Sequence, residues 1–361
     1  MKIEKICEIF GIKGEMVECT AIKTGNINKT YKLTFEENGK RTDYIVQDIN
    51  KFVFKNPDHI MKNIDAVTSH LAEKFGDERE KYVLDFLKTS DGANYFIDDE
   101  DRFMRAYKFI PDSVTYDVFD DLEILQYAGM AFGRFQMQLA DFDASTLYEI
   151  IPDFHNTASR YENLKKTAEK DEYGLKAEVS EELAFLFDNE ELATSLVTKL
   201  NEGAIPLRVT HNDTKCNNVL FDVNTGMPLA VIDLDTVMPG LTAYDFGDAV
   251  RFAANKAAED EADTSIVGVD LDKYAAFAKG FVSEVSGALT KAEIETLYLG
   301  PIVMALELSS RFLADYLDGS KYFKCNYEKH NLVRARCQIA LAKDMIAKIP
   351  ETKAIIEEYA K

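Results

Sequence analysis

The sequence predicts an α+β fold in two lobes, a first lobe built on an antiparallel sheet and a second lobe that is mainly helical. Short strand patterns dominate residues 1–108, whereas long helical patterns fill most of residues 109–361. With 361 residues the chain is long enough for both lobes to bury a core. We find no internal repeat and no long flexible linker, so we expect the lobes to pack closely around a cleft.

The first lobe begins with strand patterns that form a predicted hairpin. Residues 31–35 and 44–47 are rich in aromatic and β-branched side chains, and they flank the dipeptide Asn38-Gly39. An Asn-Gly pair between two such runs is a strong hairpin signal, because both residues accept the left-handed backbone of a tight turn.

A single helix follows the hairpin. Asn56 is a suitable N-cap, Pro57 suits the first helical position, and Gly76 suits the end. Apolar residues recur at helical spacing between these positions, so we expect the helix to lay one face on the sheet. Three further short strands are predicted at residues 82–87, 94–97 and 102–109. The predicted order of elements is β-β-α-β-β-β.

The second lobe is predicted from long apolar patterns and one β-rich island. The clearest helix covers residues 122–140, and further helices are expected near residues 180–200, 272–285, 291–317 and 329–347. The island spans residues 207–232 and contains three short strand patterns, at residues 207–209, 219–221 and 229–232.

The charge balance restricts the partners of the chain. Lys and Arg number 42 against 63 Asp and Glu, which gives a formal net charge of −21. Such an acidic chain repels polyanions, so nucleic acid and anionic membrane surfaces are poor partners. The first residues lack the apolar stretch of a signal peptide, no run is long enough to span a membrane, and the five cysteines are scattered without a CxxC pair. We therefore expect a cytoplasmic enzyme with reduced thiols, whose phosphorylated cofactor would need local cations or a metal.

The β-rich island carries the most informative pattern. His211, Asp213, Lys215 and Asn218 lie in a polar loop between two predicted strands, and Asp233 falls at the end of a later strand. Their order and spacing match H-x-D-x-K-x-x-N followed by an Asp, the pattern of kinase-like catalytic loops. Taken singly, such residues are typical of turns and solvated surfaces. In this fixed order they favour a catalytic loop.

The requirements of phosphoryl transfer assign a role to each of these residues. The reaction needs a carboxylate near the attacking hydroxyl, ligands for Mg²⁺ and cations near the transferring group. Asp213 is the candidate that accepts the hydroxyl proton, and Lys215 is the candidate that faces the γ-phosphate. Asn218 and Asp233 offer the hard oxygen ligands that Mg²⁺ prefers. The predicted cofactors are ATP and Mg²⁺.

Longer motifs carry a resemblance to a known family. The strings HNDTKCNN (211–218), IDLDTVMPG (232–240) and YDFGD (244–248) resemble the aminoglycoside phosphotransferase and choline kinase superfamily. More narrowly, the chain resembles the bacterial N-acetylhexosamine 1-kinases over nearly its whole length. The motifs that carry this narrower resemblance include GNINKTY (25–31), MRAYKFIPDSVTY (104–116), RFLADYLDG (311–319) and HNLVR (330–334). The catalytic-loop motif alone would identify only the superfamily.

This resemblance implies a bilobal protein-kinase-like fold and a set of site residues. It implies that Asp213 is the catalytic base and that Asn218 and Asp233 are the Mg²⁺ ligands. Asp235, two residues after the metal aspartate, is implied to support the site.

The resemblance also implies residues for the two substrates. Tyr107 and Phe252 would contact the adenine of ATP, and Asn26 is the further ATP-binding candidate. Arg311 and Tyr322 would hold the sugar together with Asp213. Other interpretations stay open, since Tyr107 and Phe252 could be core aromatics and Arg311 could pair with Asp315 one helical turn later.

One departure from the kinase pattern concerns the triphosphate. Protein kinases carry a lysine on the third strand that contacts the phosphates and pairs with a helix glutamate. Here Gln47 stands about where that lysine is expected, and the nearest helix offers no obvious glutamate. Lys215 and the backbone N–H groups of the turn at residues 25–28 are the candidate replacements.

The leading interpretation is an ATP-dependent anomeric kinase that converts an N-acetylhexosamine (GlcNAc or GalNAc) to its 1-phosphate. One alternative is another hydroxyl kinase of the superfamily, acting on a different sugar, an amino alcohol or an aminoglycoside. Arg311 and Tyr322 favour a neutral sugar, whereas a quaternary amine would prefer an aromatic cage, and the chain has no Trp. A catalytically silent nucleotide-binding kinase fold is the third interpretation. The exact sugar and the oligomeric state stay open.

Overall fold

The structure is a computed structural model that describes residues 3–22, 28–51, 53–116 and 120–361. Contacts divide the chain into two compact units. The first comprises Met1–Thr115, Ser145–Ile151 and Val219–Met238, and the second comprises Tyr116–Ala144, Pro152–Asn218 and Pro239–Lys361. The functional lobes expected over residues 1–108 and 109–361 stay a prediction.

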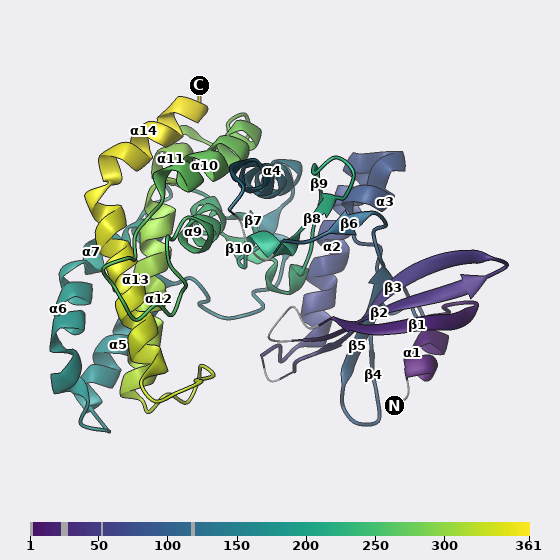
Figure 1. Cartoon of the computed structure of the whole chain (residues 1–361), viewed down its shortest axis with the longest axis horizontal. Coiled ribbons are helices and arrows are strands. Elements are labelled where there is room, and N and C mark those ends of the chain that lie inside the picture. Colours follow the sequence, from purple (N-terminus) through teal and green to yellow (C-terminus); the bar gives the residue numbers. More distant parts are fainter. Residues whose placement is uncertain (1–2, 23–27, 52, 117–119) are drawn as a thin grey trace. The chain divides into compact units, whose positions relative to one another are not determined.

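The first unit is built on a five-stranded antiparallel sheet (Figure 1). Its strands lie in the order β1 (Glu15–Ile22), β2 (Lys29–Glu37), β3 (Lys40–Ile49), β5 (Phe103–Lys108) and β4 (Phe96–Ile97). Asn38 and Gly39 have φ values of 54° and 78° and join β2 to β3. The predicted hairpin is therefore confirmed, with the left-handed turn that Asn-Gly favours.

Two helices bury apolar side chains in this unit. Helix α1 (Ile3–Ile9) places Ile6 in a core cluster with Leu33, Val46 and Met104 of the sheet. Helix α2 (Pro57–Phe75) starts as predicted, because the Asn56 side chain accepts a hydrogen bond from the backbone N–H of His59. Its buried face is the predicted one and includes Ile60, Ile64, Val67 and Leu71.

Three features of the first unit differ from the prediction. The strand expected at residues 82–87 is absent, since α3 (Arg79–Tyr82) follows η1 (Gly76–Glu78) and Phe86 makes only an isolated bridge with Tyr107. Strand β1 was missed because nearly all of its side chains are exposed, which removes the alternation that marks a half-buried strand. Helix α1 was also missed, since seven residues give little periodicity.

A small antiparallel sheet completes the first unit. It consists of β6 (Ser113–Val114), β8 (Val219–Asp222) and β9 (Pro228–Val231) in that order, and η5 (Leu234–Thr236) follows β9. The side chain of Asn63 on α2 donates hydrogen bonds to the carbonyl oxygens of Val237 (2.9 Å) and Tyr148 (2.8 Å). These bonds tie the later segments of the unit to its first part.

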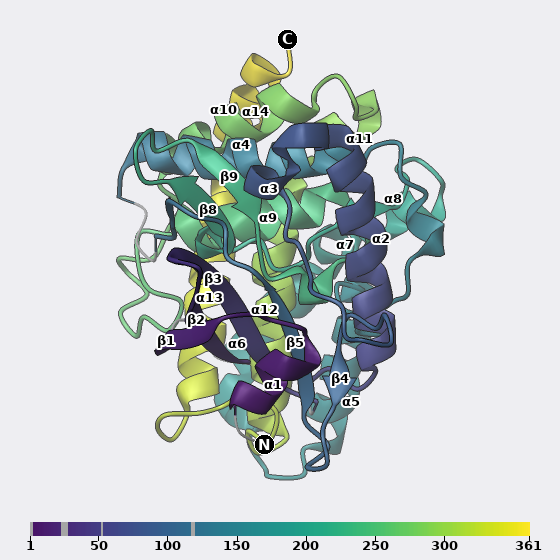
Figure 2. The same ribbon diagram turned by 90° about the vertical axis from the view of Figure 1, so that its right-hand side faces the viewer.

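The second unit is mainly helical and is organised around α12 (Leu299–Leu317), which is buried along almost its whole length. Helix α12 packs against α5 (Thr157–Lys170), α9 (Thr242–Ala253) and α13 (His330–Ala347) (Figures 1 and 2). Helix α4 (Leu122–Gln138) packs closely on α10 (Leu271–Val285). A Cβ atom on Gly280 would lie 1.9 Å from the carbonyl oxygen of Gln126, so this crossing requires glycine.

The remaining elements of the chain are short. They are η2 (Ala144–Thr146), η3 (Lys176–Val179), α6 (Ser180–Asp188), α7 (Glu190–Ala193), α8 (Ser195–Asn201), β7 (Arg208–Thr210), η4 (Cys216–Asn218), β10 (Met238–Gly240), α11 (Lys291–Thr296) and α14 (Ile349–Tyr359). The helix predicted over residues 291–317 is two helices, since α12 begins anew with Pro301 in its first turn, where proline is tolerated. The sheet with its helices and the helical unit confirm the α+β class. Within the described ranges, no helix is long and apolar enough to cross a membrane.

Candidate active site

The catalytic-loop motif follows β7 in the second unit, and Asp245 of α9 fixes its shape. The backbone N–H groups of His211 and Asn212 donate to the two carboxylate oxygens of Asp245, each at 2.8 Å. The Thr214 hydroxyl donates to the Asp245 carbonyl oxygen at 2.6 Å. Asn212 has a left-handed backbone with φ of 64°. Burial raises the pKa of Asp245, although the surrounding hydrogen bonds oppose that shift.

The motif residues Asp213, Lys215 and Asn218 are brought together in this loop. The ammonium group of Lys215 lies 3.0 Å from a carboxylate oxygen of Asp213. The Asn218 side chain donates to the Asp213 carbonyl oxygen at 2.9 Å. Among the described residues the amide oxygen of Asn218 then accepts no hydrogen bond, which suits an oxygen ligand for a metal.

Lys215 stays a cation because carboxylates surround it. Burial alone would lower the pKa of Lys215, but Asp213 and Asp248 outweigh burial and raise it. Burial opposes ionisation of Asp248 as well, yet Arg251 and then Lys215 lower its pKa. The loop thus holds a persistent positive charge in a chain whose net charge is −21.

The predicted adenine contact Phe252 lies on α9, directly after Arg251. Its side chain is 40% exposed, which excludes the alternative that it is a core aromatic. An exposed ring can stack on a flat base, so the side chain fits the predicted role.

Arg311, the first predicted sugar residue, lies on α12 in a buried charge network. Its guanidinium lies 3.3 Å from Glu307, one turn earlier, so the alternative pairing with Asp315 is wrong. His155 contacts Glu307 at 3.2 Å, and its other ring nitrogen lies 3.5 Å from the carbonyl oxygen of Asn212. The network therefore connects Arg311 to the residue that precedes Asp213.

The same network contains a second arginine that the sequence did not single out. Burial would raise the pKa of Glu307, but His155, Arg311 and Arg160 outweigh it and lower the pKa. Burial, followed by the charge of Arg311, lowers the pKa of Arg160. Arg311 and Arg160 thus both interact electrostatically with the buried Glu307, and Arg160 also interacts with Asp153.

Tyr322, the second predicted sugar residue, lies in the loop after α12. Asp315 fixes this loop by accepting the backbone N–H groups of Lys321 (2.9 Å), Tyr322 (2.8 Å) and Phe323 (2.9 Å). The Tyr322 side chain is 70% exposed, so it is available to a ligand. The guanidinium of Arg311 lies 5.6 Å from the Phe323 ring, which places this loop beside Arg311.

The predicted metal aspartate Asp233 lies in the first unit, two residues after the end of β9, with φ of 59°. Asp235 follows in η5 and pairs with Arg105 of β5. The Arg105 Nε also donates to the Gln47 side chain at 2.9 Å, and the Asn28 side chain donates to Asp235 at 2.8 Å. Sequence reasoning missed Arg105, because the motif MRAYKFIPDSVTY marks the strand and not the residue's partners.

Tyr107, the other predicted adenine contact, lies on β5 two residues after Arg105. Its ring centroid is 5.1 Å from that of Phe86, and its side chain is half-buried. Burial raises the pKa of Tyr107; the charge of Arg105 opposes this, and Asp233 and Asp235 reinforce it. Tyr107 therefore keeps its proton and lies within electrostatic range of both aspartates. The predicted ATP contact Asn26 lies outside the described residues.

The donor set fits Mg²⁺ rather than a metal with an all-protein cage. Asn218 and Asp233, one in each unit, offer an amide and a carboxylate oxygen. The described part of the chain contains no group of three or more His, Cys, Asp or Glu arranged to hold a metal. Mg²⁺ keeps several waters and uses one or two carboxylates together with substrate phosphates, so it does not need such a group.

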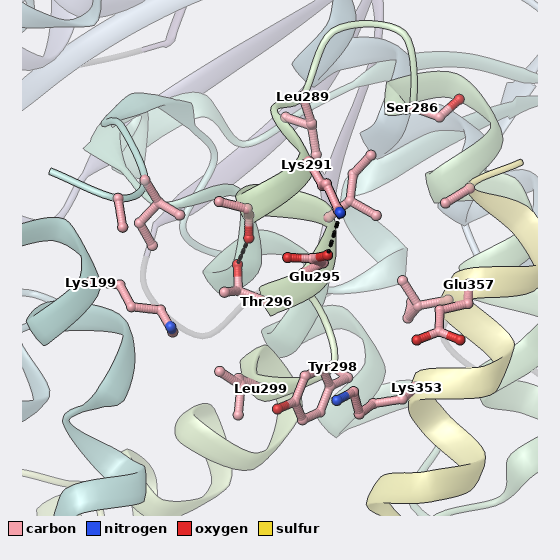
Figure 3. A pocket seen from close by; sticks show the side chains of 16 residues that line it. Lys199, Ser286, Leu289, Lys291, Glu295, Thr296, Tyr298, Leu299, Lys353 and Glu357 are labelled. Carbon is pink, nitrogen blue, oxygen red and sulfur yellow. Dashed lines mark hydrogen bonds and ion pairs between the residues drawn. The ribbon is translucent and has the colours of Figure 1, made fainter.

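A cavity of about 690 Å³ also lies in the second unit, lined by residues of α8, α11 and α14 among others (Figure 3). Figure 3 labels Lys199, Glu295, Tyr298 and Lys353 on its walls. None of the predicted site residues lines it. We therefore do not place the catalytic chemistry there.

Comparisons with known proteins show the family and the fold. The profile of the phosphotransferase enzyme family matches residues 18–278. An aminoglycoside phosphotransferase from Alicyclobacillus acidocaldarius subsp. acidocaldarius DSM 446 is 12% identical with a TM-score of 0.60, covering 96% of this chain and 95% of that chain. A choline kinase from Cryptosporidium parvum Iowa II is 14% identical with a TM-score of 0.57, covering 99% and 98%. An ADP-bound aminoglycoside phosphotransferase is 14% identical with a TM-score of 0.52, covering 95% and 98%. These structures share the bilobal protein-kinase-like fold with this chain.

Proposed function

This chain belongs to the phosphotransferase enzyme family, and we propose that it transfers the γ-phosphoryl group of ATP to the anomeric hydroxyl of an N-acetylhexosamine. The observation that carries the proposal is the Asp213–Lys215 pair, 3.0 Å apart in a loop fixed by Asp245. The motifs that resemble the N-acetylhexosamine 1-kinases support the choice of acceptor. The ADP bound in a similar structure supports ATP as the donor.

The catalytic loop supplies the base and a cation. Asp213 accepts the proton of the attacking hydroxyl, and its neighbour Lys215 offsets negative charge on the transferring phosphoryl group. An anomeric hydroxyl belongs to a hemiacetal and is more acidic than an ordinary alcohol, so a carboxylate suffices as the base. Most of the remaining rate enhancement would come from positioning.

The nucleotide and metal roles are distributed over both units. Asn218 and Asp233 would hold Mg²⁺, which when bound neutralises phosphate charge. Tyr107 and Phe252 would contact the adenine, and Asn26 is the further ATP candidate.

The acceptor side favours a neutral, oxygen-rich molecule over a cation. Arg160 and Arg311 place two guanidinium groups near Glu307, and their positive charges would disfavour choline or a polycationic aminoglycoside at close range. Arg311 has planar donors for ring oxygens, and the exposed Tyr322 adds a hydrogen bond or a stacking face. Phosphorylation of another neutral hydroxyl compound is the alternative that these residues also permit.

The test is ATP-dependent product formation in the presence of Mg²⁺ on a panel of acceptors. The panel contains N-acetylglucosamine, N-acetylgalactosamine, glucose, galactose, choline and an aminoglycoside. We expect turnover with both N-acetylhexosamines and much less with the sugars that lack the acetamido group. A site that hydrogen-bonds the acetamido group would leave its own polar groups buried and unpaired when such a sugar binds.

The matched control is Asp213→Asn, purified in parallel to exclude contaminating kinases. This variant should bind ADP normally and turn over about two to four orders of magnitude more slowly. Turnover only with choline or an aminoglycoside would contradict the proposal that the acceptor is an N-acetylhexosamine. Equal turnover by Asp213→Asn would remove Asp213 from the base role.

A further inference from the structure

Arg105 is a cation that lies beside Gln47 in the sheet. In the sheet register Gln47 of β3 lies directly opposite Arg105 of β5. The Arg105 Nε donates to the Gln47 amide oxygen at 2.9 Å, and the Gln47 amide nitrogen donates to the Thr30 hydroxyl at 3.2 Å. The cation expected on the third strand is therefore present one strand further on, held in place by the neutral residue that replaced it.

The partner of Arg105 is equally buried. The side chains of Arg105 and Asp235 are each only 2% exposed, and they form an ion pair through Nη1. Removing both charges from water has a free-energy cost that is similar in size to the gain from their mutual attraction. A buried ion pair therefore contributes little net stability to the fold. A pair that contributes little net stability is better explained by the geometry that it imposes.

The geometry concerns both oxygens of Asp235. Arg105 donates to one carboxylate oxygen of Asp235, and the Asn28 side chain donates to the other at 2.8 Å. Asp235 lies within η5, two residues after Asp233, whose left-handed φ of 59° is unusual for a residue other than glycine. Fixing Asp235 therefore fixes the short turn that aims Asp233.

The same contacts reach the segment before β2. The Asn28 amide oxygen accepts a hydrogen bond from the backbone N–H of Asn50 at 3.1 Å, and the Asn28 amide nitrogen donates to Asp235. Asn28 is the last residue of the segment 25–28, whose backbone N–H groups the sequence predicts as a candidate contact for phosphate; residues 25–27 lie outside the described residues. One network, buried at Arg105 and Asp235 and half-buried at Asn28, thus links the start of β2, the end of β3, β5 and the turn that carries Asp233.

We infer that the Arg105–Asp235 ion pair is the positioning device that replaces the lysine–glutamate pair of protein kinases, and that it aims Asp233 at the metal-bound nucleotide. Arg105 acts through Asp235 and is a positioning residue. The inference rests on the proposed function, because it takes Asp233 as a metal ligand. The sequence alone offered Lys215 and the backbone N–H groups of residues 25–28 as candidate replacements for the lysine missing at Gln47.

The test measures metal-dependent nucleotide binding by titration calorimetry. Binding of AMP-PNP with Mn²⁺ is compared with binding of ADP in the presence of EDTA, for the wild type, Arg105→Met, Arg105→Lys, Asp235→Asn and the double variant Arg105→Met/Asp235→Asn. We expect Arg105→Met to weaken Mn²⁺-AMP-PNP binding by about 10- to 100-fold, the usual effect of losing a partner behind a metal ligand. Metal-free ADP binding should change less than about twofold.

The other variants distinguish positioning from a general structural role. Arg105→Lys should retain part of the binding, because it keeps the charge but not the fork of donors. The double variant should lose little more metal-dependent binding than either single variant, since each single substitution already removes the Arg105–Asp235 ion pair. The matched control Arg208→Met breaks the buried Arg208–Glu293 pair of the second unit, and it should lower the midpoint of thermal unfolding without changing metal-dependent binding.

Failure of this inference and failure of the proposed function give different results. If the wild type binds no Mn²⁺-AMP-PNP, the proposed function itself fails. If the wild type binds and Arg105→Met binds equally well, or loses metal-free and metal-dependent binding by the same factor, the inference is overturned. Should Arg105→Met not fold, Arg105→Lys and Asp235→Asn decide between the same outcomes.

Discussion

Lys215 is the side chain through which the catalytic loop can stabilise developing charge. Asp213 and Asp248 keep it protonated, and it lies 3.0 Å from the proposed base. We predict that Lys215→Met lowers kcat by about 100-fold or more while the KM for ATP changes little, because stabilisation that grows in the transition state appears in kcat. Steady-state kinetics checks this, with Lys291→Met, an exposed lysine of α11, as the control. An unchanged kcat with a raised KM for ATP would make Lys215 a binding residue only.

The residues of the site differ in how far the sequence could predict them. Asp213, Lys215 and Asn218 lie within six residues, so their spacing alone identifies the loop. Arg105, Arg160 and Glu307 were missed because their partners are remote in sequence. Arg105 and Asp235 are 130 positions apart, and His155 and Glu307 are 152 apart, so only the fold brings them together.

The loop after α12 depends on one carboxylate. Asp315 accepts three consecutive backbone N–H groups and the Asn331 side chain, and this fixes Tyr322. We predict that Asp315→Asn raises the KM for the sugar by about tenfold and leaves the KM for ATP nearly unchanged, because an amide nitrogen cannot accept these bonds. The matched control is Asp318→Asn, a neighbouring carboxylate on an exposed pair with Lys321. An equal effect on both substrates would show that the loop does not serve the sugar.

An ion pair between Glu293 of α11 and Arg208 of β7 connects these two elements. Burial would raise the pKa of Glu293, but Arg208 and the backbone N–H of Thr290 outweigh it and lower the pKa below the ordinary value of 4.5. A lowered folded-state pKa gives stability that is present above the unfolded value and is lost as the pH falls through the folded value.

We therefore predict that Glu293→Gln lowers the free energy of unfolding by about 2 kcal/mol at neutral pH. The difference from the wild type should shrink as the pH falls below about 4.5, because protonated Glu293 loses the same charge. Thermal unfolding of both proteins over this range is the measurement. A difference that stays constant with pH would show that the ion pair does not contribute through its charge.

The elements show the same limit on prediction. The hairpin at Asn38-Gly39 and helix α2 were correctly predicted because their signals are local, a turn dipeptide and an N-cap. The strand expected at residues 82–87 was wrong, because a short apolar run does not distinguish a strand from the irregular segment that follows α3. Helix α9 was missed because it is buried on nearly every side, so that its polar residues Asp245, Asp248 and Arg251 lie inside the fold and form no solvent-facing stripe.

For the whole molecule, the superfamily predicted from the catalytic-loop motif is confirmed by the family match over residues 18–278. The acceptor does not follow from the fold, since the similar structures include both an aminoglycoside phosphotransferase and a choline kinase. The distribution of charge in the molecule bears on the choice of acceptor. The chain is strongly acidic, yet its second unit contains Lys215 in the catalytic loop and Arg160 and Arg311 near Glu307, cations suited to phosphate and to neutral oxygen-rich acceptors.

The most direct test of the proposed reaction is to follow the anomeric oxygen itself. N-acetylglucosamine labelled with ¹⁸O at the anomeric hydroxyl is incubated with ATP, Mg²⁺ and the enzyme, and the product is examined by ³¹P NMR. If the sugar hydroxyl attacks the γ-phosphorus, the label is retained as the bridge between the anomeric carbon and phosphorus, with a measurable isotope shift of the phosphorus signal. Phosphate on any other hydroxyl, or loss of the label from the product, would contradict anomeric phosphoryl transfer.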